Sequence, residues 1–176
     1  NDRNYQDVYS DPGTFMKERN NYNRSVLKLH SGSAFLRGAG FTSEGQFPFI
    51  DKVNVESFSK KRVYQSTYTN KVESIQDYDP SKKQLMVRIE SPTEFPNYYT
   101  KKTNSSKLTK VTDFKNPFKE LQNVKKQTIT YTRDDGLELS GILYLPLNYD
   151  EEKKEKMPMI LWAYPREFKD RKSASQ

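Results

Sequence analysis

The chain has 176 residues, of which 33% are hydrophobic and 30% are charged, and no apolar run approaches the roughly eighteen residues that a membrane-spanning helix needs. This composition predicts a soluble globular chain without a membrane span. The chain has no cysteine, and His30 is its one histidine, so disulfides, thiolate metal sites and multi-histidine clusters are excluded. Zinc chemistry is therefore effectively excluded.

The net charge of +7 raises the question of a nucleic-acid partner. Many of the lysines, however, occur in separated pairs beside strand-like segments, where solvated lysines prevent sheet edges from pairing with other chains. Acidic residues are interspersed among them, and dispersed charge is typical of a solvated face. We therefore expect these lysines to lie on solvated turns and expect no nucleic-acid partner. The pairs are Lys60-Lys61, Lys82-Lys83, Lys101-Lys102, Lys125-Lys126 and Lys153-Lys154.

The N-terminal residues, Asn1 to Ser10, are polar and contain neither a signal peptide nor an amphipathic targeting helix. The sequence leaves the compartment open, with an extracytoplasmic parent protein, periplasmic or secreted, as the working expectation.

Short segments rich in Val, Ile, Tyr, Phe and Thr follow, separated by clusters of turn residues, and this pattern predicts β-strands almost throughout. A turn is expected at Asp11 to Gly13. Two sets of strands come next, and no long helix is expected. The first set is predicted at 25–29, 33–37, 47–55 and 62–67, and the second at 71–77, 84–90, 97–102 and 108–113.

The two sets of strands resemble each other. Phe47-Pro48-Phe49 leads to the lysine-rich turn at 59–61, as Pro96 to Tyr99 leads to Ser105-Ser106-Lys107. The period is about 47–50 residues, which is typical of the blades of a β-propeller. The repeat predicts two consecutive four-stranded antiparallel blades, and two blades cannot close a ring.

A polar stretch beginning at Asn116-Pro117 separates the repeats from the rest and predicts a domain boundary between residues 115 and 116. Residues 127–133 alternate, 134–136 (Asp-Asp-Gly) form a turn signal, and leucines line one face of the returning strand, so a hairpin is expected. The nearly continuous apolar run from Met157 to Pro165 predicts a strand covered on both faces, as in the sheet of an α/β domain.

These last segments carry a family resemblance. Leu-Tyr-Leu-Pro at 143–146, a charged loop and the run from Pro158 to Phe168, with Trp-Ala-Tyr-Pro-Arg-Glu-Phe at 162–168, resemble the start of the hydrolase domain in the prolyl oligopeptidase family of serine peptidases, and the last motif is similar to its glutamyl endopeptidase branch. Upstream, Tyr9 to Gly13, Gly40 to Gly45 and Glu90 to Tyr99 resemble late propeller segments of that branch in the same order.

The resemblance implies a mainly β fragment: residues 1–115 from the C-terminal part of a β-propeller, and residues 116–176 as a linker and the first strands of an α/β-hydrolase domain. It implies a parent serine endopeptidase that cleaves after glutamate, and perhaps aspartate, without metal or cofactor. The family's Gly-x-Ser-x-Gly elbow is absent, since Ser43 has the wrong spacing and His30 has no evident partner. We therefore expect the catalytic triad to lie outside this chain, which should be inactive alone.

One residue of this chain is a candidate for the chemistry. Tyr164 stands at the expected carboxyl end of a buried strand, where active sites of α/β sheets gather, and resembles the family's tyrosine that completes the oxyanion hole. An aromatic side chain packed at a strand end is the alternative. Arg166, Glu94 and Tyr98 are weaker candidates for contact with substrate, against a surface ion pair and packing between blades.

The expected partners are a peptide substrate and, in cis, the remaining blades and the hydrolase domain. The isolated chain should self-associate, because an incomplete propeller leaves strand edges and apolar faces unpaired. The rival hypothesis is a non-catalytic propeller module that binds peptides or protein partners.

Overall fold

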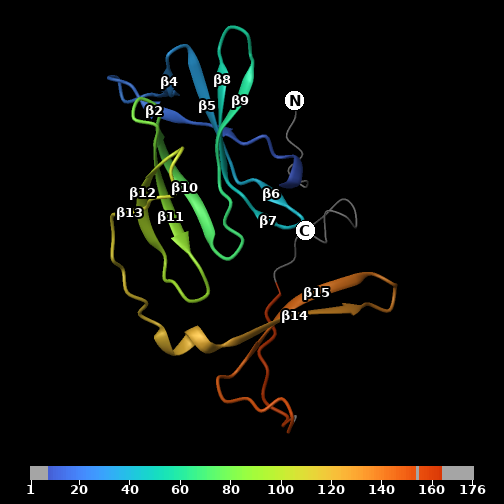
Figure 1. Cartoon of the computed structure of the whole chain (residues 1–176). Coiled ribbons are helices and arrows are strands. Elements are labelled where there is room, and N and C mark those ends of the chain that lie inside the picture. The colour runs from blue at the N-terminus through green and yellow to red at the C-terminus, as the bar shows by residue number, and fades with distance from the viewer. Residues whose placement is uncertain (1–7, 154, 164–176) are drawn as a thin grey trace. The chain divides into compact units, whose positions relative to one another are not determined.

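The computed structural model describes residues 8–153 and 155–163, and the chain divides into two compact units, Asn1–Asn116 and Pro117–Gln176. The fold is mainly β, with several antiparallel sheets (Figure 1). The division lies beside the boundary expected between residues 115 and 116, while the identity of the two parts remains a prediction. In the part of the chain that is described, no helix is long and apolar enough to cross a membrane.

The first sheet of the first unit has five strands, in the order β1 (Thr14–Phe15), β5 (Ser33–Gly38), β8 (Phe49–Asn54) and β9 (Lys60–Gln65), with β4 (Leu29–His30) also paired with β5. β8 occupies one edge of β5 along its whole length, so β1 and β4 share the other edge. They act as one edge strand that is interrupted by the hairpin of β2 (Lys17–Arg19) and β3 (Ser25–Leu27).

This arrangement corrects the strand predicted at residues 25–29, which is two short strands, β3 and β4. Asn20 causes the interruption, because its side-chain oxygen accepts hydrogen bonds from the backbone N–H groups of Tyr22 and Arg24 and closes a tight turn. Strands β1 and β2 precede the predicted set and contain polar residues that gave no strand signal.

The second sheet has four strands in sequential order, β10 (Val72–Asp79), β11 (Gln84–Glu90), β12 (Asn97–Lys102) and β13 (Thr109–Lys110). The strands predicted at 84–90 and 97–102 have these bounds. Along β11, Leu85, Val87 and Ile89 are buried, and this period of two is the alternation that a strand with one buried face requires.

The core of the first unit lies between these two sheets. It combines Met16, Phe35, Ile50 and Tyr64 from the first sheet and the loop beside it with Ile75, Tyr78, Leu85, Val87 and Ile89 from the second. The rings of Phe35 and Tyr78 meet edge to face, with centroids 5.3 Å apart. Full burial of each large apolar side chain contributes about 1.5–3 kcal/mol, so this contact holds the two sheets together.

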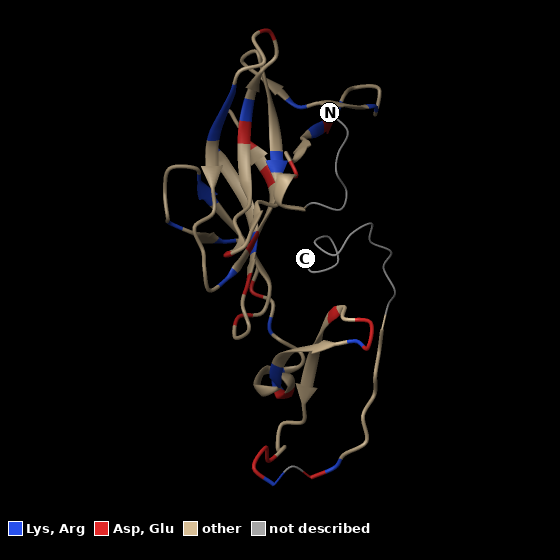
Figure 2. Cartoon of the chain, turned by 90° about the vertical axis from the view of Figure 1, so that its right-hand side faces the viewer, with Lys and Arg blue, Asp and Glu red and all other residues tan. Residues whose placement is uncertain are grey.

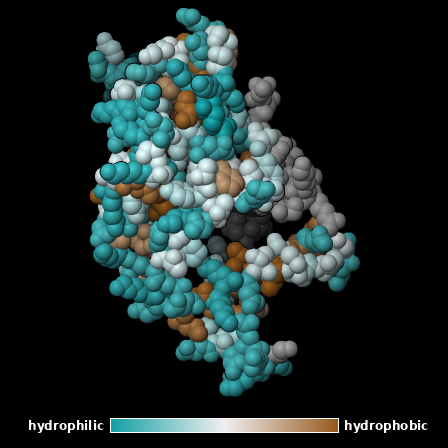
Figure 3. Space-filling model, in the orientation of Figure 1, coloured by the Kyte–Doolittle hydropathy of each residue, from teal (hydrophilic) through white to brown (hydrophobic). Residues whose placement is uncertain are grey.

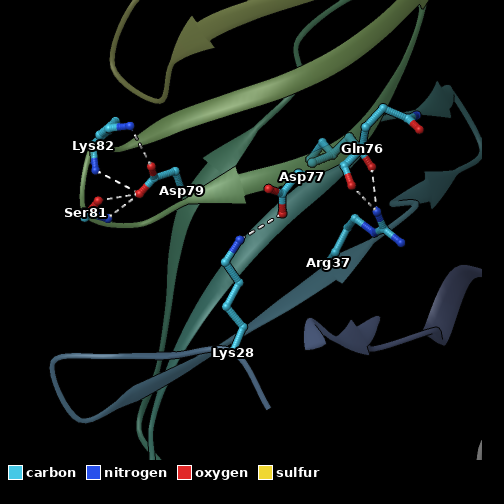
Figure 4. Close-up of polar contacts among 8 residues, drawn as sticks. Lys28, Arg37, Gln76, Asp77, Asp79, Ser81 and Lys82 are labelled. Atoms are coloured by element: carbon cyan, nitrogen blue, oxygen red, sulfur yellow. Dashed lines mark hydrogen bonds and ion pairs between the residues drawn. The ribbon is translucent and has the colours of Figure 1, made fainter. Parts of the chain in front are cut away.

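Polar contacts also join the sheets at a β-bulge in β10, where the register with β11 shifts between Ile75 and Asp77 (Figure 4). The Arg37 guanidinium donates to the carbonyl oxygens of Ile75 at 3.0 Å and Gln76 at 2.8 Å. The Lys28 ammonium pairs with Asp77 at 2.9 Å. A bulge leaves backbone groups outside the ladder, and here Arg37 satisfies them.

The first unit also contains a short 3-10 helix, η1 (Val8–Ser10), and a small hairpin of β6 (Phe41–Thr42) and β7 (Gly45–Gln46). The second unit has a 3-10 helix, η2 (Lys119–Asn123), and the hairpin of β14 (Lys125–Thr132) and β15 (Glu138–Leu145). The hairpin agrees with the prediction, and Gly136, at a φ of 83°, occupies the position of its turn that needs a left-handed backbone.

The strand predicted from Met157 to Pro165 is wrong for the residues that the structure describes. Residues 157–163 form no strand, and Ile160 and Trp162 are 96% and 85% exposed. A strand of a parallel sheet needs neighbouring strands for its backbone hydrogen bonds and helices to cover its faces. No described residues provide these partners to the segment, so its apolar composition alone does not produce a strand.

Candidate functional site

The structure describes two of the four candidate site residues, Glu94 and Tyr98. Tyr164 and Arg166 lie outside the described residues. Glu94 lies in the loop between β11 and β12, where both of its carboxylate oxygens accept from the Lys71 ammonium, at 2.7 and 2.8 Å. Tyr98 lies in β12 opposite Arg88. Within the described residues no hydrogen bond joins Glu94 to Tyr98.

The residue beside Tyr98 has a structural role. Asn97 is buried, and its side-chain amide donates to the carbonyl oxygens of Phe95 and Phe114, while its oxygen accepts from the Thr112 hydroxyl and the Phe114 backbone N–H. One side chain therefore ties the loop before β12 to the segment after β13.

The structure contains a buried polar network that was not predicted from the sequence. It joins Tyr64 of β9, Ser66 just after β9, Glu73 of β10 and Lys101 of β12. The Tyr64 hydroxyl donates to Glu73 at 2.6 Å, the Ser66 hydroxyl donates to the other oxygen of Glu73 at 3.1 Å, and the Lys101 ammonium donates to the Tyr64 oxygen at 2.8 Å. The network therefore links both sheets through charged and neutral partners.

Burial is nearly complete at this network. The side chains of Glu73 and Lys101 are 0% and 7% exposed, and the Lys101 Nζ lies 3.6 Å from the nearer Glu73 oxygen, beyond hydrogen-bonding distance. The same nitrogen lies 4.9 Å from the centre of the Tyr64 ring and 5.3 Å from that of Tyr68, within the range of cation–π attraction. Two aromatic rings and one carboxylate thus surround the ammonium.

The electrostatics keep Tyr64 protonated. Burial, and then the hydrogen bond to Glu73, raise the pKa of the Tyr64 hydroxyl far above its ordinary value, because ionisation would place a second negative charge beside the carboxylate. Burial, followed by the charge of Glu73, raises the pKa of Tyr68 as well. Both phenols are therefore neutral hydrogen-bond donors in the physiological range.

A pocket of about 260 Å³ lies against this network. Residues from the end of β9 and the loop after it form one wall, and residues from the end of β12 and its following loop form the other. The lining consists of Tyr64, Gln65, Thr67, Tyr68, Lys101, Thr103, Asn104, Ser105 and Ser106.

The burial of Lys101 corrects the expectation that the lysine pairs lie on solvated turns. Lys102 is exposed, as expected, but Lys101 alternates with it along β12 and lies opposite Leu85, a fully buried residue of β11. The alternation of side chains along a strand predicts this burial, since Lys101 lies on the same face of β12 as Asn97 and Tyr99. Its buried partners, Tyr64 and Glu73, belong to β9 and β10, so the sequence of β12 alone does not predict them.

The chemistry of this network is that of a satisfied polar cluster. Among the described residues, no buried side-chain nitrogen or oxygen lacks a hydrogen-bond partner, and no group of three or more His, Cys, Asp or Glu side chains is arranged to hold a metal ion. Ser66 donates its proton to a carboxylate that already accepts from Tyr64 and has no imidazole beside it in the described structure. The arrangement suits binding and structural roles better than nucleophilic catalysis.

Comparison with known proteins gives relatives of one kind. No family model matches the chain. The chain is 33% identical over 189 aligned residues to a protein of Oryza sativa subsp. japonica named "Probable glutamyl endopeptidase, chloroplastic", and 31% identical over 190 to a protein of the same name from Arabidopsis thaliana. Each alignment covers 99% of this chain. A solved structure, the AtxE2 isopeptidase in its apo form, matches 68% of this chain and 18% of its own, at 15% identity and a TM-score of 0.36, a likeness too low to support an argument.

The chain spans about a fifth of the length of the curated relatives that it matches, 20% of each. Both relatives are named as endopeptidases, and the similarity extends over nearly all of this chain rather than over one motif.

Proposed function

We propose that this chain is part of a serine peptidase of the prolyl oligopeptidase family, in its glutamyl endopeptidase branch. In this proposal the first unit contributes two blades of a β-propeller, and residues 116–176 contribute the linker and the first strands of the α/β-hydrolase domain. The full-length protein cleaves peptides after glutamate, and perhaps aspartate, through an acyl-enzyme intermediate, with a catalytic triad outside these 176 residues.

The similarity over 99% of the chain to two relatives named glutamyl endopeptidase is the observation that carries this proposal. The second sheet, a four-stranded antiparallel meander, is compatible with a blade. The first sheet is also compatible with a four-stranded blade if β1 and β4, which both pair with β5, count as a single interrupted strand.

Within this proposal Tyr164 supplies a neutral donor to the oxyanion that forms during acyl transfer, because such a donor stabilises charge that develops only in the transition state. Arg166, Glu94 and Tyr98 are proposed contacts for substrate. Glu94 would have to exchange its Lys71 partner for the substrate.

The proposed partners are a peptide substrate and, in cis, the remaining blades and the hydrolase domain. We also propose that the isolated chain self-associates. Exposed apolar residues on the hairpin of the second unit support this, since Ile142 and Tyr144 are 61% and 57% exposed on one face and Tyr131 is 55% exposed on the other. On the face of the molecule in Figure 3, brown apolar patches lie scattered within a mostly hydrophilic surface.

The test uses the full-length protein, a fluorophosphonate probe that labels activated serines, and a peptide library read by mass spectrometry. We expect one labelled serine outside these 176 residues, cleavage after glutamate, and loss of cleavage once the serine is labelled. The chain alone should show no turnover above buffer. A protein that takes no label and cleaves no peptide, yet still binds peptides, would replace the proposal with the non-catalytic propeller module.

A further inference from the structure

The hairpin of β2 and β3 is an insertion into an edge strand that is otherwise continuous. The backbone N–H of Met16 donates to the carbonyl oxygen of Phe35 at 2.8 Å. The next position of β5 is Ala34, and it pairs with Leu29. The edge strand therefore skips residues 17–28 and resumes in the same register, so the sheet would keep its pairing without them.

The inserted hairpin takes no part in the core of the first unit. Every residue from Lys17 to Leu27 is exposed except Asn20, which is half-buried. The side-chain hydrogen bonds of this segment, made by Arg19 and Asn20, all stay within the hairpin. A two-stranded hairpin that is exposed on both faces adds little stability to a fold, so its role depends on what it reaches.

The hairpin leaves its sheet where the first strands of the two sheets meet. Within the described residues, β4 and β10 each pair with a neighbouring strand along one edge only. Lys28, at the base of the hairpin, reaches across to Asp77 of β10 at 2.9 Å (Figure 4). Figure 1 shows β2 beside β4, on the side of β5 away from β8. The sheets of a propeller stand around a central channel with their first strands innermost, so in the proposed propeller the hairpin projects toward that channel.

The dimensions of the hairpin suit it to narrow such a channel. A strand rises about 3.3 Å per residue, so the arm from Lys17 to the tip at Tyr22 is roughly 15 Å long. Paired strands lie about 5 Å apart, so the hairpin takes up the width of two extended chains, about 10 Å. An extended peptide that passes through the channel therefore competes with the hairpin for the same space.

Bulk rather than charge is what the hairpin presents to a passing peptide. It carries Lys17, Arg19 and Arg24 against Glu18. Figure 2 shows Lys and Arg on several separate strands and loops of the first unit, with Asp and Glu among them, rather than in one basic patch. A small excess of exposed charge is screened by salt within about 10 Å, so it does not select a polyanionic partner.

We propose that residues 17–28 form a barrier in the propeller channel that sets which peptides reach the peptidase site by their length. Short peptides pass beside the hairpin, and long ones enter more slowly because they have to displace it. This role rests on the propeller and the peptidase activity proposed above. It makes the hairpin a determinant of substrate length and leaves the choice of the cleaved bond to the residues that perform the chemistry.

The test compares the full-length protein with a variant that lacks residues 17–28, in which Met16 is joined directly to Leu29. The substrates are a short chromogenic peptide with glutamate at the cleavage site and a long unstructured peptide that contains the same site. We expect kcat/KM to stay within about twofold for the short peptide and to rise about fivefold or more for the long one, because only the long chain competes with the hairpin. Lys28→Ala removes only the ion pair with Asp77 and should leave both values unchanged.

The outcomes separate the role of the hairpin from the proposed function. If the full-length protein cleaves both peptides and the deletion leaves the ratio of the two kcat/KM values within about twofold, the barrier is refuted and the peptidase activity stands. If the full-length protein cleaves neither peptide, the proposed function is wrong, and the barrier is refuted with it.

A second pair of variants keeps the hairpin in place and enlarges it. Tyr22→Cys and Phe58→Cys each place a thiol on an exposed turn, since these side chains are 84% and 79% exposed, and any cysteine elsewhere in the full-length protein is replaced by serine. Phe58 lies between β8 and β9, the strands of the first sheet farthest from β4. A bulky maleimide on residue 22 should lower kcat/KM for the long peptide about fivefold or more, and the same label on residue 58 should leave it unchanged. Equal effects of the two labels would overturn the proposal.

Discussion

Replacing Tyr64 by phenylalanine tests whether the buried network stabilises the contact between the two sheets. The variant keeps the ring that packs in the core and removes only the hydroxyl. That hydroxyl donates to Glu73 at 2.6 Å and accepts from Lys101 at 2.8 Å. Hydrogen bonds to charged groups contribute about 1.5–3 kcal/mol each, so the two together set an upper bound of about 3–6 kcal/mol.

A new contact between Lys101 and Glu73 should offset part of the stability lost in Tyr64→Phe. The Lys101 ammonium lies 3.6 Å from Glu73, and a small rotation would close the gap into a direct ion pair. If that contact replaces about one hydrogen bond, the free energy of unfolding should fall by about 2–4 kcal/mol. Tyr68→Phe is the matched control, because Tyr68 also places its ring near Lys101, and no hydrogen bond of its hydroxyl is seen among the described residues. Its effect should stay below about 0.5 kcal/mol.

The assay is denaturant-dependent hydrogen exchange of the full-length protein, read by mass spectrometry on peptides from β10, β11 and β12, which reports the free energy of opening of this segment. A difference between Tyr64→Phe and Tyr68→Phe below about 0.5 kcal/mol would refute the reasoning. The pH dependence gives a second check. Folding raises the pKa of Tyr64 above its value in the unfolded chain, so the stability that the Tyr64 hydroxyl contributes is complete below about pH 10 and is lost as the pH rises further. The phenylalanine variant should not show this loss of stability at high pH.

Three further outcomes are expected. Gly38→Ala should lower stability by about 1–3 kcal/mol in thermal denaturation, because a Cβ at Gly38 would overlap the Phe49 ring that packs over it, and an unchanged melting temperature would contradict this packing. The Ser81 hydroxyl and neighbouring backbone N–H groups hold the pKa of Asp79 at about 2, so the stability that Asp79 contributes is present above about pH 4 and is lost as the pH falls toward 2. In Asp79→Asn, unfolding followed by circular dichroism should therefore depend less on pH between about 4 and 2. In the full-length protein, Tyr164→Phe should lower kcat about a hundredfold to a thousandfold with KM nearly unchanged, and a change below about threefold in steady-state kinetics would leave Tyr164 with a packing role.

Local sequence patterns predicted only part of the candidate site. The prolines around residues 92–96 make Glu94 and Tyr98 candidates, and the structure gives Glu94 a lysine partner and places Tyr98 in β12. The network around Glu73 was missed, because its members come from segments that are separate in the sequence and none carries a motif. A buried charge becomes visible only when the partners that satisfy it are known.

Features that depend only on neighbouring residues could be predicted from the sequence. The alternation of β11 and β12 and the glycine at the turn of the β14–β15 hairpin are local signals, because side-chain direction and turn conformation are set within a few residues. Tertiary structure decided the rest. Lys101 is buried because β9 and β10 bring Tyr64 and Glu73 to it, and residues 157–163 form no strand because a strand exists only where a neighbouring strand accepts its hydrogen bonds.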